Sequence, residues 1–473
     1  MKNSTLFSNS FFIFIARVFP SLANLLVVIW YSRHLPQATY GNYQHFWIQL
    51  YVLAPIACMG IHVLAVTYRP GFVMKLLNSI KARQYVFYAV WVIVLAGIFA
   101  VMQCNALHIS FIIPFLFLLC YTLVIIFESS LIVFRNYTWL VGTNIVYSAA
   151  FCAIHWYVLG HGFSLQTLFS YLLVITVLRL CAYAGVAIAD MQRYNEEEHD
   201  EQYHVGKIRT LWLHLGLYDV TQVLFGYIDK FVISLALSAQ LSAIYYNGSQ
   251  PIPFLPLLLG AAGSAVLIQL ARGSKKNETE DAIQLMNQLG RVLSCIVFPV
   301  FFFLFFYGAP LLIGLLGEQY RPAVPIFMVS LLVLPVRAYH FTTILQRMHK
   351  GSIINIGSLG DLLLACALIY PLYLWKGLPG VALSFVISTY AQAAFYLFYA
   401  AKLVDTSILK LIPYVNWIIK LIVFASLFIA IRYAANLYFT GIIPLILGGI
   451  AMIAMISISL LMEYKKQSNY GRR

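Results

Sequence analysis

The chain has 473 residues, of which 62% are hydrophobic and only 10% are charged. An average soluble domain is about 25% charged, so this composition excludes a soluble enzyme, a disordered chain and a disulfide-stapled scaffold. It indicates a membrane protein with many spans. The net charge is +14, which we attribute to basic cytoplasmic loops. We expect no nucleic-acid binding, because no soluble segment is long enough to form a binding module.

Fourteen stretches approach or exceed the length of about 20 apolar residues that a membrane helix needs. Six precede an acidic segment at 191–208, at 6–32, 42–67, 84–103, 109–133, 137–159 and 164–190. Eight follow it, at 209–237, 244–271, 291–317, 322–348, 352–375, 379–402, 413–435 and 440–462. The sequence therefore predicts an all-α integral membrane protein with about 14 transmembrane helices.

The basic residues predict how these spans are oriented. If the N-terminus is inside, 21 of the 30 basic residues lie in or beside inside loops, whereas the outside loops contain only Arg33, Arg321 and Lys376. Cytoplasmic loops collect Lys and Arg, so we expect both termini to be cytoplasmic.

The acidic segment suggests the domain organisation. We expect an N-terminal lobe of six spans at 1–190, a cytoplasmic linker at 191–208, a C-terminal lobe of six spans at 209–402, and two further spans with a tail at 403–473. The exits of the first and seventh spans share a pattern, because Leu35 and Tyr43 match Leu237 and Tyr245 at one offset. This agrees with a parallel repeat, one of the architectures of transporters; chance similarity between apolar segments is the alternative.

Motifs of enzyme chemistry are missing from the sequence. It contains no P-loop, zinc-protease or serine-hydrolase pattern, and the predicted outside loops are too short for a membrane glycosyltransferase or polymerase. The seven cysteines are odd in number and lie mostly inside apolar spans, which favours packing over disulfides or metal binding. We expect neither an enzyme nor a metal or organic cofactor.

Ionisable residues inside the spans are the candidate functional residues. Each costs about 2.5–3.5 kcal/mol at a helix centre, so they must face the protein interior, a water-filled cavity or each other. The cationic set, with one amide, is expected to bind an anionic substrate: Arg17, Asn24, Arg179, Lys230 and Arg337. The carboxylates are candidates for gating or for coupling transport to H+ or Na+: Asp219, Asp229, Asp361 and Glu128.

The alternative for each of these residues is a structural ion pair, such as Arg337 with Asp361. Lys230 is not expected to pair with Asp229, because neighbouring helical side chains diverge. Lys420 and Arg432 lie near the ends of their span and are expected to reach outward. Four tyrosines are candidates for stacking on sugars, with interfacial or core packing as the alternative: Tyr218, Tyr227, Tyr245 and Tyr339.

Four short motifs resemble those of polysaccharide (O-antigen-type) flippases, which belong to the multidrug/oligosaccharidyl-lipid/polysaccharide exporter superfamily. They begin at Leu35-Pro36, at Ile228-Asp229-Lys230, at Leu316-Gly317-Glu318 and at Gly377-Leu378-Pro379. The resemblance implies two six-helix lobes in a V shape around a cavity that opens to one side at a time. The implied substrate is an undecaprenyl-diphosphate-linked oligosaccharide, and the last two spans are expected to line a groove for its tail.

The resemblance also implies a bacterial inner (cytoplasmic) membrane protein of lipopolysaccharide synthesis. Its partners would be the lipid-linked glycan, membrane lipids, a polysaccharide polymerase and glycosyltransferases. Two relatives of the same superfamily are alternatives, namely a peptidoglycan-precursor flippase and a multidrug or cation antiporter. Proton-coupled drug exporters usually carry an acidic residue in the first span, where this chain has Arg17, and this favours an anionic substrate.

Overall fold

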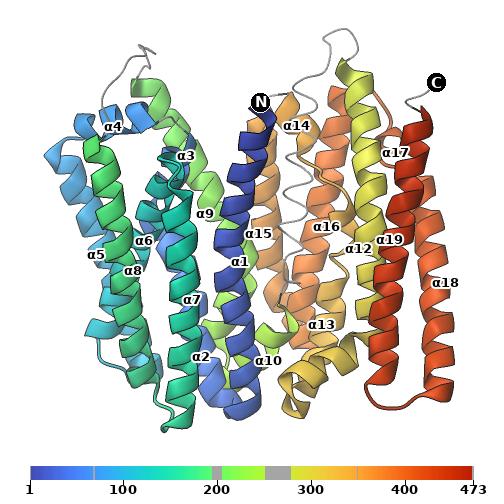
Figure 1. Ribbon diagram of the computed structural model, residues 1–473, viewed down its shortest axis with the longest axis horizontal. Coiled ribbons are helices and arrows are strands. Elements are labelled where there is room, and N and C mark those ends of the chain that lie inside the picture. Colours follow the sequence, from blue (N-terminus) through green and yellow to red (C-terminus); the bar gives the residue numbers. More distant parts are fainter. Residues whose placement is uncertain (1, 68–69, 194–204, 251–277, 349, 471–473) are drawn as a thin grey trace. The chain divides into compact units, whose positions relative to one another are not determined.

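The computed structural model describes residues 2–67, 70–193, 205–250, 278–348 and 350–470, which form helices and the turns between them (Figure 1). Contacts divide the chain into two compact units, residues 1–243 and 244–473. The first contains α1 (Lys2–His34), α2 (Gln37–Cys58), α3 (Ile61–Thr67), α4 (Pro70–Ser79), α5 (Ala82–Leu107), α6 (Ile112–Val133), α7 (Tyr137–Gly160), α8 (Leu165–Arg193) and α9 (Val205–Ala236).

Helix α10 (Ala239–Gly248) crosses the division between the units. The second unit then contains α12 (Glu278–Leu316), η1 (Glu318–Ala323), α13 (Val324–Leu331), η2 (Pro335–Ala338), α14 (Thr343–Arg347), α15 (Gly351–Lys376), α16 (Leu378–Leu403), α17 (Ile408–Leu411), α18 (Tyr414–Tyr438) and α19 (Ile443–Tyr470). The all-α membrane fold is thereby confirmed.

The helices follow the predicted spans closely. Within the described residues, eleven helices are long and apolar enough to cross a membrane, or twelve if α2 and α3 form one bent span. Helix α9 covers the predicted seventh span with 32 residues but is not among the eleven apolar helices. Most of the predicted eighth span, 244–271, lies outside the described residues. The short helix α4 between the second and third spans was not predicted.

The second span is broken near its predicted cytoplasmic end. Met59 and Gly60 have φ angles of 49° and 70°, and α2 and α3 meet at a bend of 58°. A Cβ atom on Gly60 would lie 2.3 Å from the Cα of Gly216 in α9. Glycine is therefore required at position 60 both for the left-handed backbone and for the close approach of α9.

The tenth predicted span, 322–348, is not one continuous helix. After α13 the chain turns through η2, and Tyr339 is extended, with φ −141° and ψ 147°. Pro335 lacks the N–H that a continuing α-helix would need, and the Arg337 N–H instead donates to the Leu334 carbonyl over 2.8 Å. Residues 318–338 still count as one of the apolar segments long enough to cross a membrane, but α13 gives way to the 3-10 helix η2 at Pro335.

The first and seventh span exits, which carry the repeated pattern, lie against each other inside the first unit. A Cβ on Gly41 would lie 1.8 Å from the Ala239 carbonyl oxygen, and the Gln240 amide donates to Gln37 over 3.0 Å. Helix α9 also packs along α2. Its contacts therefore assign α9 to the same unit as the N-terminal helices. The lobe boundary at 191–208 stays a prediction.

Candidate functional site

Arg337 is presented by the irregular backbone of the broken tenth span. Its side chain is exposed, and it makes no ion pair within 4.0 Å with any residue that the structure describes. Asp361 on α15 attracts it electrostatically, as the sequence suggested, but the two groups are not in direct contact. An unwound segment at membrane depth is tolerated only where it is packed by protein or lines a water-filled cavity. This principle places the segment that contains Arg337 against protein or beside a water-filled cavity.

Asp361 lies on α15 of the same unit. Its residue is 3% exposed, and its carboxylate makes no ion pair within 4.0 Å with any described residue. Ser388 on α16 lies beside it, and Ser384 and Thr389 of the same helix are also buried. A buried carboxylate without a cationic partner is costly, and the coupling role of Asp361 stays a prediction.

Arg179 has a different environment, in the first unit. Its guanidinium donates to Glu128 over 2.9 Å and lies 4.7 Å from the centre of the Tyr147 ring. It also contacts the Tyr183 hydroxyl, which donates to Asn144 over 3.0 Å. Both members of this pair were candidate functional residues, and the structure brings them together as a half-buried ion pair that joins α8 to α6.

Lys230 and Asp229 on α9 form an ion pair, contrary to expectation. The Lys230 ammonium lies 3.3 Å from both oxygens of Asp229, and the two residues are 7% and 5% exposed. The argument that adjacent side chains diverge was wrong here, because a long lysine side chain can fold back where no water competes. Leaving either charge buried without a partner would cost more free energy than the folded-back conformation of the lysine side chain.

Asp219 pairs with a residue that the sequence argument overlooked. The His62 Nε2 atom on α3 lies 3.4 Å from an Asp219 oxygen on α9, and each side chain is about one-fifth exposed. The close backbone contact between Gly60 and Gly216 also joins this part of the chain to α9. A 2.8 Å hydrogen bond from the Trp212 indole to the Met59 carbonyl does the same. A histidine inside a predicted span was the available signal, since intramembrane ionisable residues are rare.

Arg17 and Asn24 lie on α1, and their side chains have no polar partner among the described residues. Arg17 is exposed and Asn24 is half-buried; neither side chain makes a hydrogen bond or ion pair with any other part of the described chain. Ser21 on the same face donates to the Arg17 carbonyl over 2.9 Å. The binding roles of all the cationic candidates stay predictions.

The C-terminal helices contain a buried ion pair that the sequence argument missed. The Lys420 ammonium lies 3.2 Å from Glu463 on α19 and also donates to the Arg291 carbonyl of α12 over 2.7 Å. The expectation that Lys420 reaches outward was wrong, because these partners hold it inside. Arg432 is exposed and donates to the Phe306 carbonyl of α12. Both cations therefore connect α18 to neighbouring helices, Lys420 to α12 and α19 and Arg432 to α12.

The four candidate sugar-stacking tyrosines divide by burial. Tyr245 and Tyr339 are 1% and 5% exposed, and the Tyr339 hydroxyl donates to the Leu411 carbonyl over 3.0 Å. Both side chains are therefore buried, and Tyr339 belongs to a hydrophobic core cluster of the second unit. Tyr218 and Tyr227 are half-buried on α9, and Tyr227 lies 5.7 Å from the ring of Tyr51.

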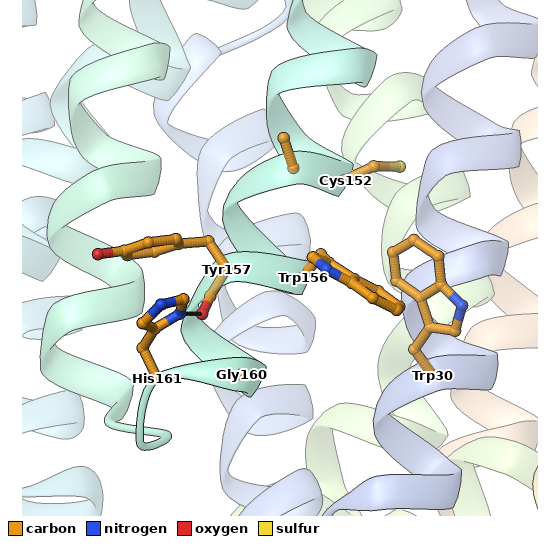
Figure 2. Close-up of a pocket in the computed structure, with 7 residues that line it drawn as sticks. Trp30, Cys152, Trp156, Tyr157, Gly160 and His161 are labelled. Carbon is orange, nitrogen blue, oxygen red and sulfur yellow. Dashed lines mark hydrogen bonds between the residues drawn. The ribbon is translucent and has the colours of Figure 1, made fainter.

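Within the described residues, no cluster of three or more His, Cys, Asp or Glu side chains could hold a metal ion. The structure does contain a recess between α1 and α7 (Figure 2). Its volume is about 550 Å³, and its lining is mostly aromatic or small: Trp30, Cys152, Ala153, Trp156, Tyr157, Gly160 and His161.

Comparisons with known proteins agree with this architecture. Residues 201–325 match a family model described as a polysaccharide biosynthesis protein. The fold resembles a solved structure of the lipid II flippase MurJ in an inward closed conformation, with a TM-score of 0.68 and 15% identity over 96% of this chain and 98% of that one. It also resembles an inward-facing multidrug MATE transporter of the MOP superfamily, with a TM-score of 0.54 and 13% identity over 82% and 94%. No curated protein sequence matches.

The fold and these comparisons define a class. The chain is a multi-spanning membrane protein with the fold of the MurJ and MATE transporters, and its middle section carries the pattern of the polysaccharide biosynthesis proteins. The flippase resemblance inferred from the short motifs is confirmed at this level.

Proposed function

We propose that this protein is a flippase that moves an undecaprenyl-diphosphate-linked oligosaccharide, such as an O-antigen or other surface polysaccharide unit, from the cytoplasmic to the outer leaflet. The observation that carries the proposal is Arg337, an exposed guanidinium on unwound backbone inside a predicted membrane span. A planar guanidinium binds phosphate oxygens through two parallel hydrogen bonds. Discontinuous helices form substrate sites in many transporters.

The proposed mechanism is alternating access. The glycan and diphosphate enter from the cytoplasm while the polyprenyl tail stays in lipid, and Arg337 binds the anionic head group. Arg179 stays paired with Glu128 and stabilises the first unit. Movement of the lobes then exposes the head group to the outer side. The process needs no chemical step on the substrate, so we assign transport rather than glycosyl transfer to this protein.

Asp361 is proposed as the coupling residue. It is buried, has no ion-pair partner within 4.0 Å in the described structure and interacts electrostatically with the exposed Arg337, so a proton or sodium ion bound there would change the attraction between the two groups. Asp219, Asp229 and Glu128 are weaker candidates for the same role, because each already has a cationic or imidazole partner. Within this proposal Asp219 and Asp229 act in gating, and Glu128 serves as the structural partner of Arg179.

A peptidoglycan-precursor flippase is the second candidate, favoured by the MurJ-like fold. A head group containing diphosphate suits both candidates, and the family model at 201–325 favours the polysaccharide substrate. A drug or cation antiporter is the third, favoured by the likeness to MATE transporters. The unpaired Arg337 disfavours a cationic substrate, since like charges in a water-poor site repel.

Complementation separates the candidates. The chain is expressed in three bacterial strains, which lack the O-antigen flippase, the peptidoglycan-precursor flippase or the main drug exporters. We expect surface polysaccharide to return in the first strain only. Arg337→Ala should abolish this rescue at equal membrane abundance, whereas Arg321→Ala, at an exposed turn where Glu318 binds the guanidinium, should rescue like the wild type. Rescue of only the second or third strain would contradict the proposal.

A further inference from the structure

The break in the tenth predicted span leaves a backbone carbonyl that its own helix does not satisfy. At the end of α13 the N–H groups of Leu332, Val333 and Leu334 donate to carbonyls three residues earlier, over 3.0, 3.2 and 2.9 Å. Continuing this i→i+3 pattern, the Leu332 carbonyl would accept from residue 335. That residue is a proline, which has no N–H, so position 335 provides no donor for Leu332.

Tyr390 of α16 provides a donor from outside the span. Its hydroxyl donates to the Leu332 carbonyl over 3.0 Å, and α16 packs against α13. Leu332 lies near the middle of the predicted span 322–348. Because an unsatisfied carbonyl is costly at membrane depth, this hydrogen bond stabilises the irregular backbone more than it would stabilise a regular helix.

The other end of the irregular segment is held by different contacts. The Tyr339 hydroxyl donates to the Leu411 carbonyl over 3.0 Å, and the Tyr339 ring meets the Trp417 ring edge to face at 6.1 Å. Arg337 thus lies between two anchored positions, the Leu332 carbonyl and the Tyr339 side chain. A binding group acts well only when its supporting contacts hold it in place, so loss of either anchor should affect Arg337.

We propose that Tyr390 is a positioning residue for the head-group site: it donates to the carbonyl that Pro335 leaves without a donor and so holds the irregular segment in the conformation that presents Arg337. The inference rests on the proposed function, because it assigns to Tyr390 an effect on substrate affinity that acts through Arg337. It also makes Pro335 and Tyr390 depend on each other. If position 335 regains an N–H, the Leu332 carbonyl gains a backbone donor and no longer needs the tyrosine hydroxyl.

A purely structural contact between α13 and α16 is the competing explanation, and α16 provides a matched control. The hydroxyl of Tyr396 donates to the Ile354 carbonyl over 2.8 Å, and Ile354 belongs to the continuous helix α15. Tyr390→Phe and Tyr396→Phe therefore each remove a hydrogen bond from a tyrosine of α16 to a carbonyl of another helical segment. Of the two carbonyls, only that of Leu332 lies in the broken span.

The first test measures transport of a fluorescent undecaprenyl-diphosphate-linked oligosaccharide in proteoliposomes over a range of concentrations, which separates KM from the maximal rate. We expect Tyr390→Phe to raise KM about fivefold, the equivalent of about 1 kcal/mol for one hydrogen bond, and to keep the maximal rate within about twofold of the wild type. Tyr396→Phe should keep the wild-type KM, although both variants lower the unfolding temperature. In a Pro335→Ala background, Tyr390→Phe should leave KM unchanged.

The second test is hydrogen exchange of the full chain in detergent, which needs no substrate. We expect the backbone amides of residues 332–340 to exchange faster in Tyr390→Phe than in the wild type, and Tyr396→Phe to leave their exchange unchanged. Wild-type exchange in Tyr390→Phe would overturn the proposal, because the hydroxyl would then not hold the segment.

A wild-type KM in Tyr390→Phe would also overturn it. Leu332 is 37% exposed, and that result would show that water replaces the hydroxyl. The proposal is equally contradicted if both tyrosine variants raise KM alike, or if Tyr390→Phe raises KM as much with Pro335→Ala as without it. Failure of the proposed function is a separate result, visible as wild-type protein that restores no surface polysaccharide in the complementation assay, while hydrogen exchange still reports on Tyr390.

Discussion

Arg179 and Arg337 look alike in the sequence, since each is an arginine near the middle of an apolar span, yet their surroundings differ. Arg179 lies on the continuous helix α8, with Glu128 at 2.9 Å and two tyrosine rings around its guanidinium. Arg337 lies on the broken tenth span, is exposed and has no direct anionic partner in the described structure. A regular helix with a paired charge supports the fold, whereas an irregular segment with an unpaired charge is available for a ligand.

The largest effect we expect concerns the paired arginine. Arg179→Met should lower the free energy of unfolding by about 3–5 kcal/mol, because it leaves Glu128 as an uncompensated charge inside the membrane domain. Thermal unfolding in detergent measures this loss. The double variant Arg179→Met/Glu128→Leu should regain most of the stability, and a double variant as unstable as the single one would contradict a purely structural role for the pair.

The next effect concerns the two similar span exits. Gly41→Val should destabilise the first unit by about 1–3 kcal/mol, the usual cost of overpacking, since a Cβ would clash with the Ala239 carbonyl. Gly142→Val is the matched control, because a Cβ at Gly142 meets nothing within 4 Å. Equal unfolding temperatures for both variants would show that the contact between the two exits does not constrain the fold.

The irregular backbone around Arg337 can be tested without touching the arginine. Pro335→Ala restores an N–H that could extend α13, so we expect transport to fall on the order of tenfold, about 1.4 kcal/mol, while the unfolding temperature stays the same or rises. Rates of glycan delivery at equal abundance measure this. Pro371→Ala, inside the continuous helix α15, is the control, and equal transport by both variants would weaken the role of the break.

The smallest effect concerns the C-terminal helices. Asn416 donates to Glu463 over 3.2 Å and supports the buried pair with Lys420, so Asn416→Ala should cost about 1 kcal/mol of stability, typical of one hydrogen bond, with transport unchanged. A larger loss of transport than of stability would instead place this network in the mechanism.

Much of the fold follows from the sequence, because apolar length and basic loops leave few alternatives for a membrane chain. The same reasoning failed where a local rule met a tertiary contact. Lys230 folds back onto Asp229 because both are buried, and Lys420 stays inside because Glu463, distant in sequence, lies on the neighbouring helix. Helix periodicity contains no information about such partners.

The candidate site was predictable in part. The ionisable residues were identified from the free energy that each would cost in lipid. Their pairing could not be predicted, since it depends on which helices are neighbours. His62 was overlooked because histidine was not counted among the intramembrane charges, although it pairs with Asp219. The break at Pro335 was visible in the sequence, and its consequence for Arg337 became clear only from the backbone.

The most direct test of the account compares the two arginines in one transport assay. Proteoliposomes containing a fluorescent undecaprenyl-diphosphate-linked oligosaccharide report its movement between leaflets. We predict that Arg337→Gln slows this movement at least about 30-fold, the equivalent of about 2 kcal/mol for a lost charged contact, while Arg179→Met/Glu128→Leu stays within about threefold of the wild type. Wild-type movement by Arg337→Gln would contradict the claim that this residue binds the head group.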